Sequence, residues 1–279
     1  MSRSKRLVTV TAGRLVHAVC YSQVFPSDPP RARAEKSRCS SAARARMNFR
    51  YSYEKLQLLI AANFNRSDLF VTLTFDDAHL PASRPAADKV VARFLRRFGA
   101  VRRRAGESLK YIKCTHELLD DGGRRLHFHM VINAGDERRD YELIRSLWDQ
   151  GSNIDIRLIC RSDHYSYDDF LELAKYLARE RDPDAPLTAV GRRSWSGSRN
   201  LVKPVRESYL VDDNLTVEAP PGAFVLDVDE RRNEYGSFKY IKYLLPDRGP
   251  AAAQPSGAPP SGRPPGGRRP GGGRVAPGG

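Results

Sequence analysis

Two histidines separated by one apolar residue, His127-Phe128-His129, stand in a run typical of a buried strand, residues 126–132. Successive strand residues point to opposite faces of a sheet, so both imidazoles share one face while Phe128 points to the other. Two imidazoles side by side on a rigid strand form half of a divalent-metal site. Taken alone, the motif also fits two surface histidines on an edge strand.

Two further strand-like runs, residues 69–76 and 111–117, alternate apolar and polar side chains in the same way. We expect the second run to form a hairpin with the histidine strand, because Asp-Gly-Gly at 121–123 is a strong turn signal. The apolar faces of the three runs would form one core surface. The opposite face would then carry the polar side chains Thr72, Thr74, Lys113, Thr115, Glu117, His127 and His129.

Glu117 is the carboxylate that this pairing would bring across from the two histidines. Two imidazoles and one carboxylate leave coordination positions open for a substrate, and they suit Mg²⁺ or Mn²⁺ acting on a phosphate better than they suit zinc. The sequence therefore predicts a Mg²⁺ or Mn²⁺ site formed by His127, His129 and Glu117.

A helix predicted over residues 168–181 carries Tyr176 at the border of its apolar stripe. Spacing alone fits an amphipathic edge residue with its ring on the core. Beside a metal-bound phosphate, however, a tyrosine can attack phosphorus and form a covalent DNA–tyrosine intermediate. Lys175 and Arg179 flank Tyr176 and would lower its pKa or hold the phosphate.

The order of predicted elements indicates the fold class. Helices are expected over 47–63, 86–105, 137–149 and 168–181, and strands over 69–76, the hairpin 110–133, 153–160, 206–212, 222–230 and 236–245. The order β-α-β-β-α-β followed by a helix is the split βαβ, ferredoxin-like pattern of the α+β class. Two helices would cover one face of the antiparallel sheet, and the active site would lie on the other face, partly roofed by the helix that follows.

Composition divides the chain into three expected parts: a basic, flexible N-terminal segment over 1–46, the main domain over 47–245, and a disordered Pro/Gly/Arg tail over 246–279. We find no apolar run that could span a membrane and no signal-peptide pattern. The four cysteines lack metal-finger spacing, which fits a reducing cytoplasm.

The net charge of +14 favours a polyanionic partner. Residues 1–50 hold eleven Lys and Arg against two acidic residues. Further basic clusters occur within 93–104 and within 192–206. Such clusters can contact phosphates, and the binding would then weaken steeply with salt. The expected DNA contacts are Thr72, Thr74, Lys113, Arg192, Arg193, Arg199 and Lys203.

Taken in order, the motifs resemble those of HUH endonucleases, the rolling-circle replication initiators of small phages, single-stranded DNA viruses and plasmids. Residues 69–76 resemble the first motif, residues 127–129 the histidine–hydrophobe–histidine motif, and residues 175–179 the nucleophile motif. The basic segment 191–201 resembles the Ser-Arg-Asn stretch of phage-type replication proteins. The resemblance covers about residues 48–245.

The resemblance implies roles for individual residues. His127 and His129 would be metal ligands, with Glu117 as the acidic third ligand. Tyr176 would nick single-stranded DNA at a replication origin and keep the 5′ phosphate, leaving a 3′ hydroxyl to prime synthesis. A host helicase and polymerase would then act as partners in the host cytoplasm, because no GxxxxGK[ST] motif of a fused helicase occurs.

The chain departs from the pattern of this family at two positions. Arg179 stands where a lysine is usual, which keeps the charge but not a readily exchanged proton. Glu180 stands where initiators with paired tyrosines have the second one, so alternation between two nucleophiles is not expected by that route. The rival tyrosines are Tyr165, Tyr167, Tyr240 and Tyr243.

Three other functions remain open. An HUH transposase or relaxase would use the same chemistry. A non-catalytic ferredoxin-like nucleic-acid-binding protein would instead need stacking aromatics on the open sheet face, where Thr, Glu and His are expected here. An inactive homologue that acts as an origin-binding repressor would not need the complete His-His-Glu set.

Overall fold

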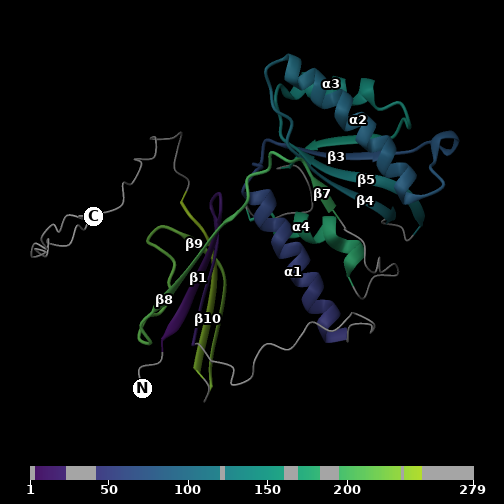
Figure 1. The fold of residues 1–279 in the computed structure, drawn as a ribbon. Coiled ribbons are helices and arrows are strands. Elements are labelled where there is room, and N and C mark those ends of the chain that lie inside the picture. The colour runs from purple at the N-terminus through teal and green to yellow at the C-terminus, as the bar shows by residue number, and fades with distance from the viewer. Residues whose placement is uncertain are drawn as a thin grey trace, which may run out of the picture. The chain divides into compact units, whose positions relative to one another are not determined.

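The computed structural model describes residues 4–22, 42–119, 123–159, 169–182, 195–233 and 236–246. They contain two five-stranded antiparallel sheets, and Figure 1 shows these with the helices beside them. The first sheet has the order β6-β3-β5-β4-β7 and the second the order β8-β1-β2-β10-β9. All of the described residues belong to one compact unit, residues 1–246.

The first sheet, here called the histidine sheet, consists of β3 (Leu69–Thr74), β4 (Tyr111–Leu118), β5 (Arg124–Ile132), β6 (Ile154–Leu158) and β7 (Trp195–Gly197). All its pairings are antiparallel. Two helices connect its strands, α2 (Arg84–Arg104) and α3 (Glu137–Leu147), and a short 3-10 turn η1 covers Asp77–His79. The order β6-β3-β5-β4 is that of a split βαβ unit, so the α+β, ferredoxin-like prediction is confirmed.

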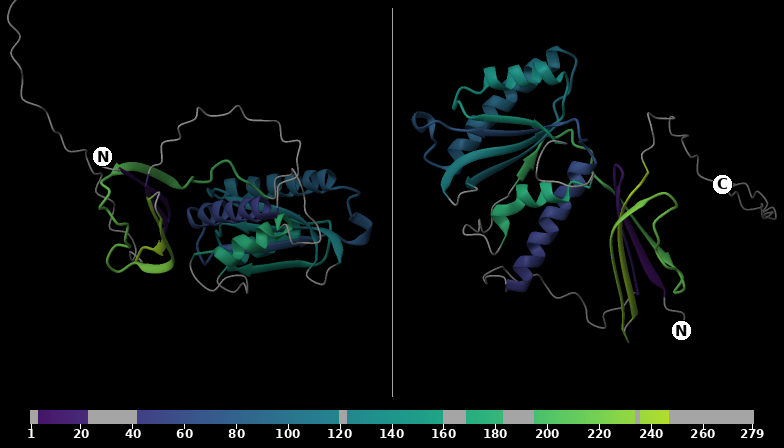
Figure 2. Two further views of the ribbon diagram at one scale, coloured as in Figure 1. Left: turned by 90° about the horizontal axis from the view of Figure 1, so that it is seen from below. Right: turned by 180° about the vertical axis from the view of Figure 1, so that it is seen from behind.

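Both faces of the histidine sheet bury an apolar core. On one face, α2 and α3 pack over Val71, Leu73 and Phe128. On the other face, α1 (Ala42–Ala61) and α4 (Leu171–Ala178) pack over Phe70, Ile112, Cys114 and Val131. Figures 1 and 2 show the two pairs of helices on opposite sides of the strands. The helix α4, which continues into the 3-10 turn η3 (Arg179–Arg181), therefore covers the face expected to hold the site.

The second sheet joins the two ends of the described chain. Its strands are β1 (Lys5–Ala12), β2 (Leu15–Ser22), β8 (Val205–Val211), β9 (Phe224–Asn233) and β10 (Gly236–Leu244). The expectation of a flexible segment over 1–46 is thus wrong for residues 5–22. Basic residues hid this hairpin, because Arg6 and Lys5 alternate with the apolar side chains that pack on the partner strands. The predicted tail, 246–279, lies outside the described residues except Pro246.

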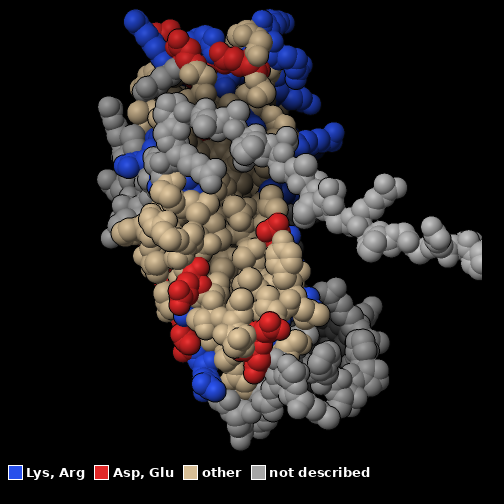
Figure 3. Space-filling model, turned by 90° about the vertical axis from the view of Figure 1, so that its left-hand side faces the viewer, with Lys and Arg blue, Asp and Glu red and all other residues tan. Residues whose placement is uncertain are grey.

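Exposed apolar side chains lie on the edge strands of the second sheet, among them Tyr209, Leu210, Phe224 and Val228. Figure 3 views the molecule from the side where β8 and β9 lie in Figure 1. Uncharged side chains fill much of the middle of this face, and Lys and Arg gather toward its upper end. The charge of the chain is therefore unevenly distributed over its surface.

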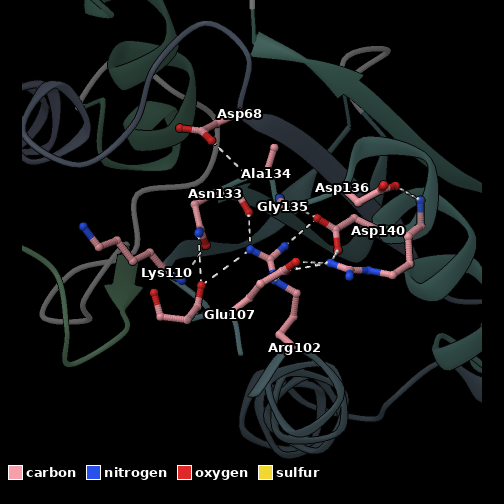
Figure 4. Close-up of polar contacts among 11 residues, drawn as sticks. Asp68, Arg102, Glu107, Lys110, Asn133, Ala134, Gly135, Asp136 and Asp140 are labelled. Carbon is pink, nitrogen blue, oxygen red and sulfur yellow. Dashed lines mark hydrogen bonds and ion pairs between the residues drawn. The ribbon is translucent and has the colours of Figure 1, made fainter. Parts of the chain in front are cut away.

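One arginine of the expected phosphate-binding cluster has a different role. Arg102 is only 1% exposed and pairs with buried Asp140 at 2.5 Å, while its guanidinium also donates to the carbonyl oxygen of Asn133 at 3.2 Å. Figure 4 shows this network, in which Glu107 also pairs with Arg102 at 2.9 Å. Arg102 thus ties α2 to the start of α3, and the expectation that it contacts phosphates is wrong.

Candidate metal and nucleophile site

His127 and His129 lie side by side on β5, on the sheet face covered by α4. Their Nε2 atoms are 3.1 Å apart, and both side chains are buried. The strand register sets Thr72 of β3 opposite His129, and the Thr72 hydroxyl is 3.0 Å from His129 Nδ1. The prediction that the two histidines share a face with Thr72 is confirmed.

His116 is the third member of this cluster. It lies on β4 directly opposite His127, and ligand atoms of His116, His127 and His129 all lie within 4.8 Å of one another. Among the described residues, this group of possible metal ligands contains three histidines and no carboxylate.

Sequence reasoning missed His116 because it assumed that only one face of the sheet was apolar. Ile112 and Cys114 were assigned to the core opposite the histidines, but they share a face with His116 and pack beneath α1 and α4. The signal was present in the predicted hairpin. Pairing residues at equal distance from positions 121 and 122 places His116 opposite His127.

Glu117 occupies a different environment from the one expected. The strand β4 has an irregularity between His116 and Leu118, and the Glu117 carboxylate accepts a hydrogen bond from Arg84 Nε at 2.8 Å. Its side chain is thus engaged with the first residue of α2. The structure places His116, rather than Glu117, beside the histidine pair.

Hydrogen bonds fix which nitrogen of each ring carries a lone pair. His116 Nε2 lies 3.0 Å from the carbonyl oxygen of Leu177, so it is the protonated donor. His127 Nδ1 likewise lies 2.8 Å from the carbonyl oxygen of Arg125. The opposite nitrogens, His116 Nδ1 and His127 Nε2, must then carry lone pairs.

The donor set fits a divalent metal. Among the described side chains, His116 Nδ1 is a buried nitrogen with no hydrogen-bond partner. Burial lowers the pKa of His116 to about 4, which keeps the ring neutral near pH 7. Carbonyl groups that accept from the outer nitrogens of metal-binding histidines are a common second layer of such sites. Three neutral imidazoles held in this way could bind one metal ion.

Tyr176 of α4 reaches the same cluster. Its hydroxyl oxygen is 3.1 Å from His129 Nε2, and the two ring centroids are 4.9 Å apart. The guanidinium carbon of Arg179 lies 4.3 Å from the Tyr176 ring centroid. Lys175 lies at the surface, where its amine pairs with Glu172 at 2.8 Å. Tyr176 and Arg179 therefore lie where the sequence motif predicted them relative to the histidines.

Both ends of α4 are anchored. Before its first residue, the carbonyl oxygen of Asp169 accepts a hydrogen bond from Gln57 of α1 at 2.7 Å, and Lys242 of β10 pairs with the Asp169 carboxylate at 3.5 Å. After its last residue, Glu180 is buried and pairs with Arg84 at 2.6 Å. These contacts hold the helix, and with it Tyr176, against the histidine sheet.

The backbone at the start of α4 is also unusual. Phe170 has φ of 57°, a left-handed conformation that is rare for a bulky residue. Its side chain is buried in the core beneath α4. Such conformations cost about 1–3 kcal/mol and persist where the surrounding structure enforces them. The local strain is therefore offset by the packing that places α4.

The expected DNA contacts are distributed over both sides of the sheet. Thr74 faces the histidine side and donates to the carbonyl oxygen of Asn153 at 2.6 Å. Lys113 faces the opposite side, where it pairs with Asp88 of α2. With Arg199 it lines a hollow of about 1030 Å³ next to α2. Lys203 is exposed, while Arg192 and Arg193 lie outside the described residues.

The rival tyrosines have less suitable positions. Tyr240 and Tyr243 lie on β10 of the second sheet, and burial is the main cause that raises the pKa of each phenol. A raised pKa disfavours the phenolate that attacks phosphorus. Tyr165 and Tyr167 lie outside the described residues.

Residues 68–181, about two fifths of the chain, match a family model described as a replication-associated protein of the ORF2 type. The matched range contains all three histidines and Tyr176. The match supports the resemblance to rolling-circle replication initiators that the motifs indicated. No curated protein and no solved structure matches the chain.

No helix in the described ranges is long and apolar enough to cross a bilayer.

Proposed function

We propose that this chain is a metal-dependent HUH endonuclease that nicks and rejoins single-stranded DNA and so initiates rolling-circle replication. The observation that carries the proposal is the approach of the Tyr176 hydroxyl to the cluster of His116, His127 and His129, at 3.1 Å from His129 Nε2. The family match over 68–181 supports it independently, because the same residues form the site.

In the proposed reaction, the Tyr176 hydroxyl loses its proton and its oxygen attacks the scissile phosphorus. The bond from phosphorus to the 3′ oxygen breaks, and that oxygen takes up a proton to become a free 3′ hydroxyl. The 5′ phosphate stays on Tyr176 as a phosphodiester. Rejoining is the reverse step, in which a 3′ hydroxyl attacks the same phosphorus and releases the tyrosine.

The side chains around Tyr176 have distinct roles. His116, His127 and His129 would hold a divalent metal, which supplies charge stabilisation and polarisation of the phosphate when bound. Arg179 is permanently charged and lies over the Tyr176 ring, so it stabilises the phenolate and the phosphate without exchanging protons. Lys175 is placed to bind the strand beside the reacting phosphate.

Of the two metals expected from the sequence, we favour Mn²⁺ over Mg²⁺. Mg²⁺ is a hard cation that prefers oxygen ligands, whereas the protein offers three imidazole nitrogens. Mn²⁺ tolerates nitrogen ligands better while still acting on phosphate oxygens.

DNA contacts beyond the site are proposed at Lys113 and Arg199, which line one hollow beside α2, and at exposed Lys203. The basic pair Arg192 and Arg193 lies in the same part of the chain. A host helicase and polymerase would extend the 3′ end. An HUH transposase or relaxase uses the same chemistry and would differ in the DNA that it joins.

The test uses labelled single-stranded oligonucleotides that tile the DNA flanking the gene, incubated with the full-length protein and either Mn²⁺ or EDTA. We expect a covalent protein–DNA adduct and a free 3′ end with Mn²⁺ and neither with EDTA. Salt-sensitive binding without cleavage of any oligonucleotide would instead support a non-catalytic nucleic-acid-binding protein.

A further inference from the structure

A surface groove between α1 and α4 opens beside Tyr176. Its volume is about 660 Å³, and the two helices lie side by side in Figures 1 and 2. On the α4 side, Tyr176 itself lines the groove together with Glu172, Lys175, Arg179 and Asp182. A ligand in the groove would therefore lie next to the reacting hydroxyl.

The α1 side of the groove is a single stripe of basic and aromatic residues. Arg46, Phe49, Arg50 and Tyr53 line it, at the spacing i, i+3, i+4, i+7 that places side chains on one face of a helix. Arg46 and Arg50 are exposed, and Phe49 and Tyr53 are half-buried, with their rings edge to face at 5.2 Å. The stripe thus offers positive charge and aromatic faces together.

The charges of the groove favour a polyanion. Four of its lining residues are basic and two are acidic. The ion pair of Arg50 with Glu54 at 2.7 Å, like that of Lys175 with Glu172, lies toward the surface, where such pairs contribute little stability. Both cations can exchange a carboxylate for a phosphate at small cost.

The aromatic side chains narrow the choice of polyanion. Phosphate contacts alone would suit duplex or single strand, but Phe49 and Tyr53 can stack only on bases whose faces are accessible. Basic residues that follow a backbone, combined with aromatic rings that stack on bases, are the features of single-strand binding grooves. The helix α1 also precedes the residues that match the family model, so that match does not account for the stripe.

We propose that the α1–α4 groove binds the unpaired strand that adjoins the phosphate attacked by Tyr176. Arg46, Arg50 and Lys175 contact its phosphates, and its bases stack on Phe49 and Tyr53. The assignment rests on the proposed function only in naming this strand as the one that is cut. The α1 stripe would then set how strongly the substrate is held.

The test measures fluorescence anisotropy of a labelled oligothymidylate of about 12 nucleotides, a length within the usual range of single-strand site sizes. The full-length Tyr176→Phe protein is the background, and EDTA is present, so neither nicking nor metal affects the binding. A hairpin duplex with the same label is the second probe. Circular dichroism melting of each variant establishes that it is folded at the assay temperature.

Two matched pairs of variants isolate the stripe. Arg46→Glu is compared with Arg44→Glu, an equal charge reversal at an exposed site of the same helix that does not line the groove. Phe49→Ala is compared with Tyr51→Ala, whose side chain is 61% exposed and also off the groove. Each control thus shares the helix and the kind of change.

We expect Arg46→Glu to weaken oligothymidylate binding at least about tenfold more than Arg44→Glu, and to reduce the salt slope by about 0.7, the value for one phosphate of a single strand. We expect Phe49→Ala to weaken it about tenfold relative to Tyr51→Ala and to leave duplex binding unchanged. Equal effects within each pair would overturn the proposal, as would an equal weakening of duplex binding in Phe49→Ala.

The outcome is separable from that of the proposed function. Stripe-dependent binding in a protein whose wild type forms no covalent adduct would keep the groove and contradict the nickase. An adduct in the wild type together with stripe-independent binding would keep the nickase and contradict the groove.

Discussion

The hydroxyl oxygen of Tyr176 lies 3.1 Å from Nε2 of His129, although the two residues are 47 positions apart and lie on different elements. The helix α4 carries the tyrosine and the strand β5 carries the histidine. This approach places a nucleophile and a set of neutral metal-binding nitrogens around one point. The predictions below test the parts of that arrangement one at a time.

Replacing His116 tests the composition of the metal site. In His116→Gln, we expect Mn²⁺ affinity to fall by more than about tenfold, because second-layer changes alone cost that much and His116 contributes a nitrogen directly. Glu117→Gln should bind Mn²⁺ as the wild type does. The measurement is the Mn²⁺-induced rise in melting temperature, which reports binding to the folded state. The reverse order of the two variants would return the carboxylate to the site.

Metal preference tests the all-nitrogen ligand set. Isothermal titration should show tighter binding of Mn²⁺ than of Mg²⁺, because imidazole suits transition metals better than Mg²⁺. The double variant His127→Ala/His129→Ala is the control and should bind neither ion at this site. Tighter binding of Mg²⁺ by the wild type would contradict the assignment of ligands.

The buried pair of Arg84 and Glu180 should contribute strongly to stability. In Arg84→Met, Glu180 keeps a buried charge without its partner, so we expect a loss of about 3–5 kcal/mol in the free energy of unfolding. Adding Glu180→Gln should restore part of it. Arg97→Met, at an exposed pair with Asp149, should cost less than about 1 kcal/mol. Urea unfolding measures all three, and similar losses for Arg84 and Arg97 would contradict the anchoring of α4.

His17, on β2, predicts a pH dependence of stability. Burial, followed by the charges of Lys242 and Arg50, lowers its pKa from 6.5 to about 3. The unfolded chain therefore binds a proton below pH 6.5 that the folded chain refuses, so stability is present above pH 6.5 and falls as the pH drops toward 3.

The His17→Gln variant isolates this effect. Between about pH 6 and pH 5, the wild type should lose up to about 1.4 kcal/mol per pH unit more than the variant. The measurement is urea unfolding at a series of pH values with EDTA present. Parallel pH profiles for the two proteins would show that His17 is not buried in its neutral form.

Much of the fold could be predicted from the sequence, because the helices and strands of the histidine sheet have clear periods. The pattern of residues 69–76 correctly placed Thr72 beside the histidine strand, and the turn at 121–123 correctly paired β4 with β5. The second sheet could not be predicted as a unit. It joins residues 5–22 to residues 205–244, and no local pattern specifies a pairing between the two ends of a chain.

The site was predicted in part for a related reason. His127 and His129 were found because one strand sets their spacing, and Tyr176 because its motif follows at the expected place. His116 was missed because the alternation rule treats one face of a sheet as polar, whereas here α1 and α4 bury the second face as well. The groove beside Tyr176 was missed because the stripe on α1 gains meaning only from its contact with α4.

The most direct test of the central claim is to identify the residue that carries the DNA. The Mn²⁺-dependent adduct would be digested with protease and nuclease, and the modified peptide sequenced by mass spectrometry. We predict a nucleotide attached to Tyr176, and no adduct in Tyr176→Phe while Tyr53→Phe still forms one. Attachment to Tyr53, Tyr240, Tyr243 or any other residue would contradict the account.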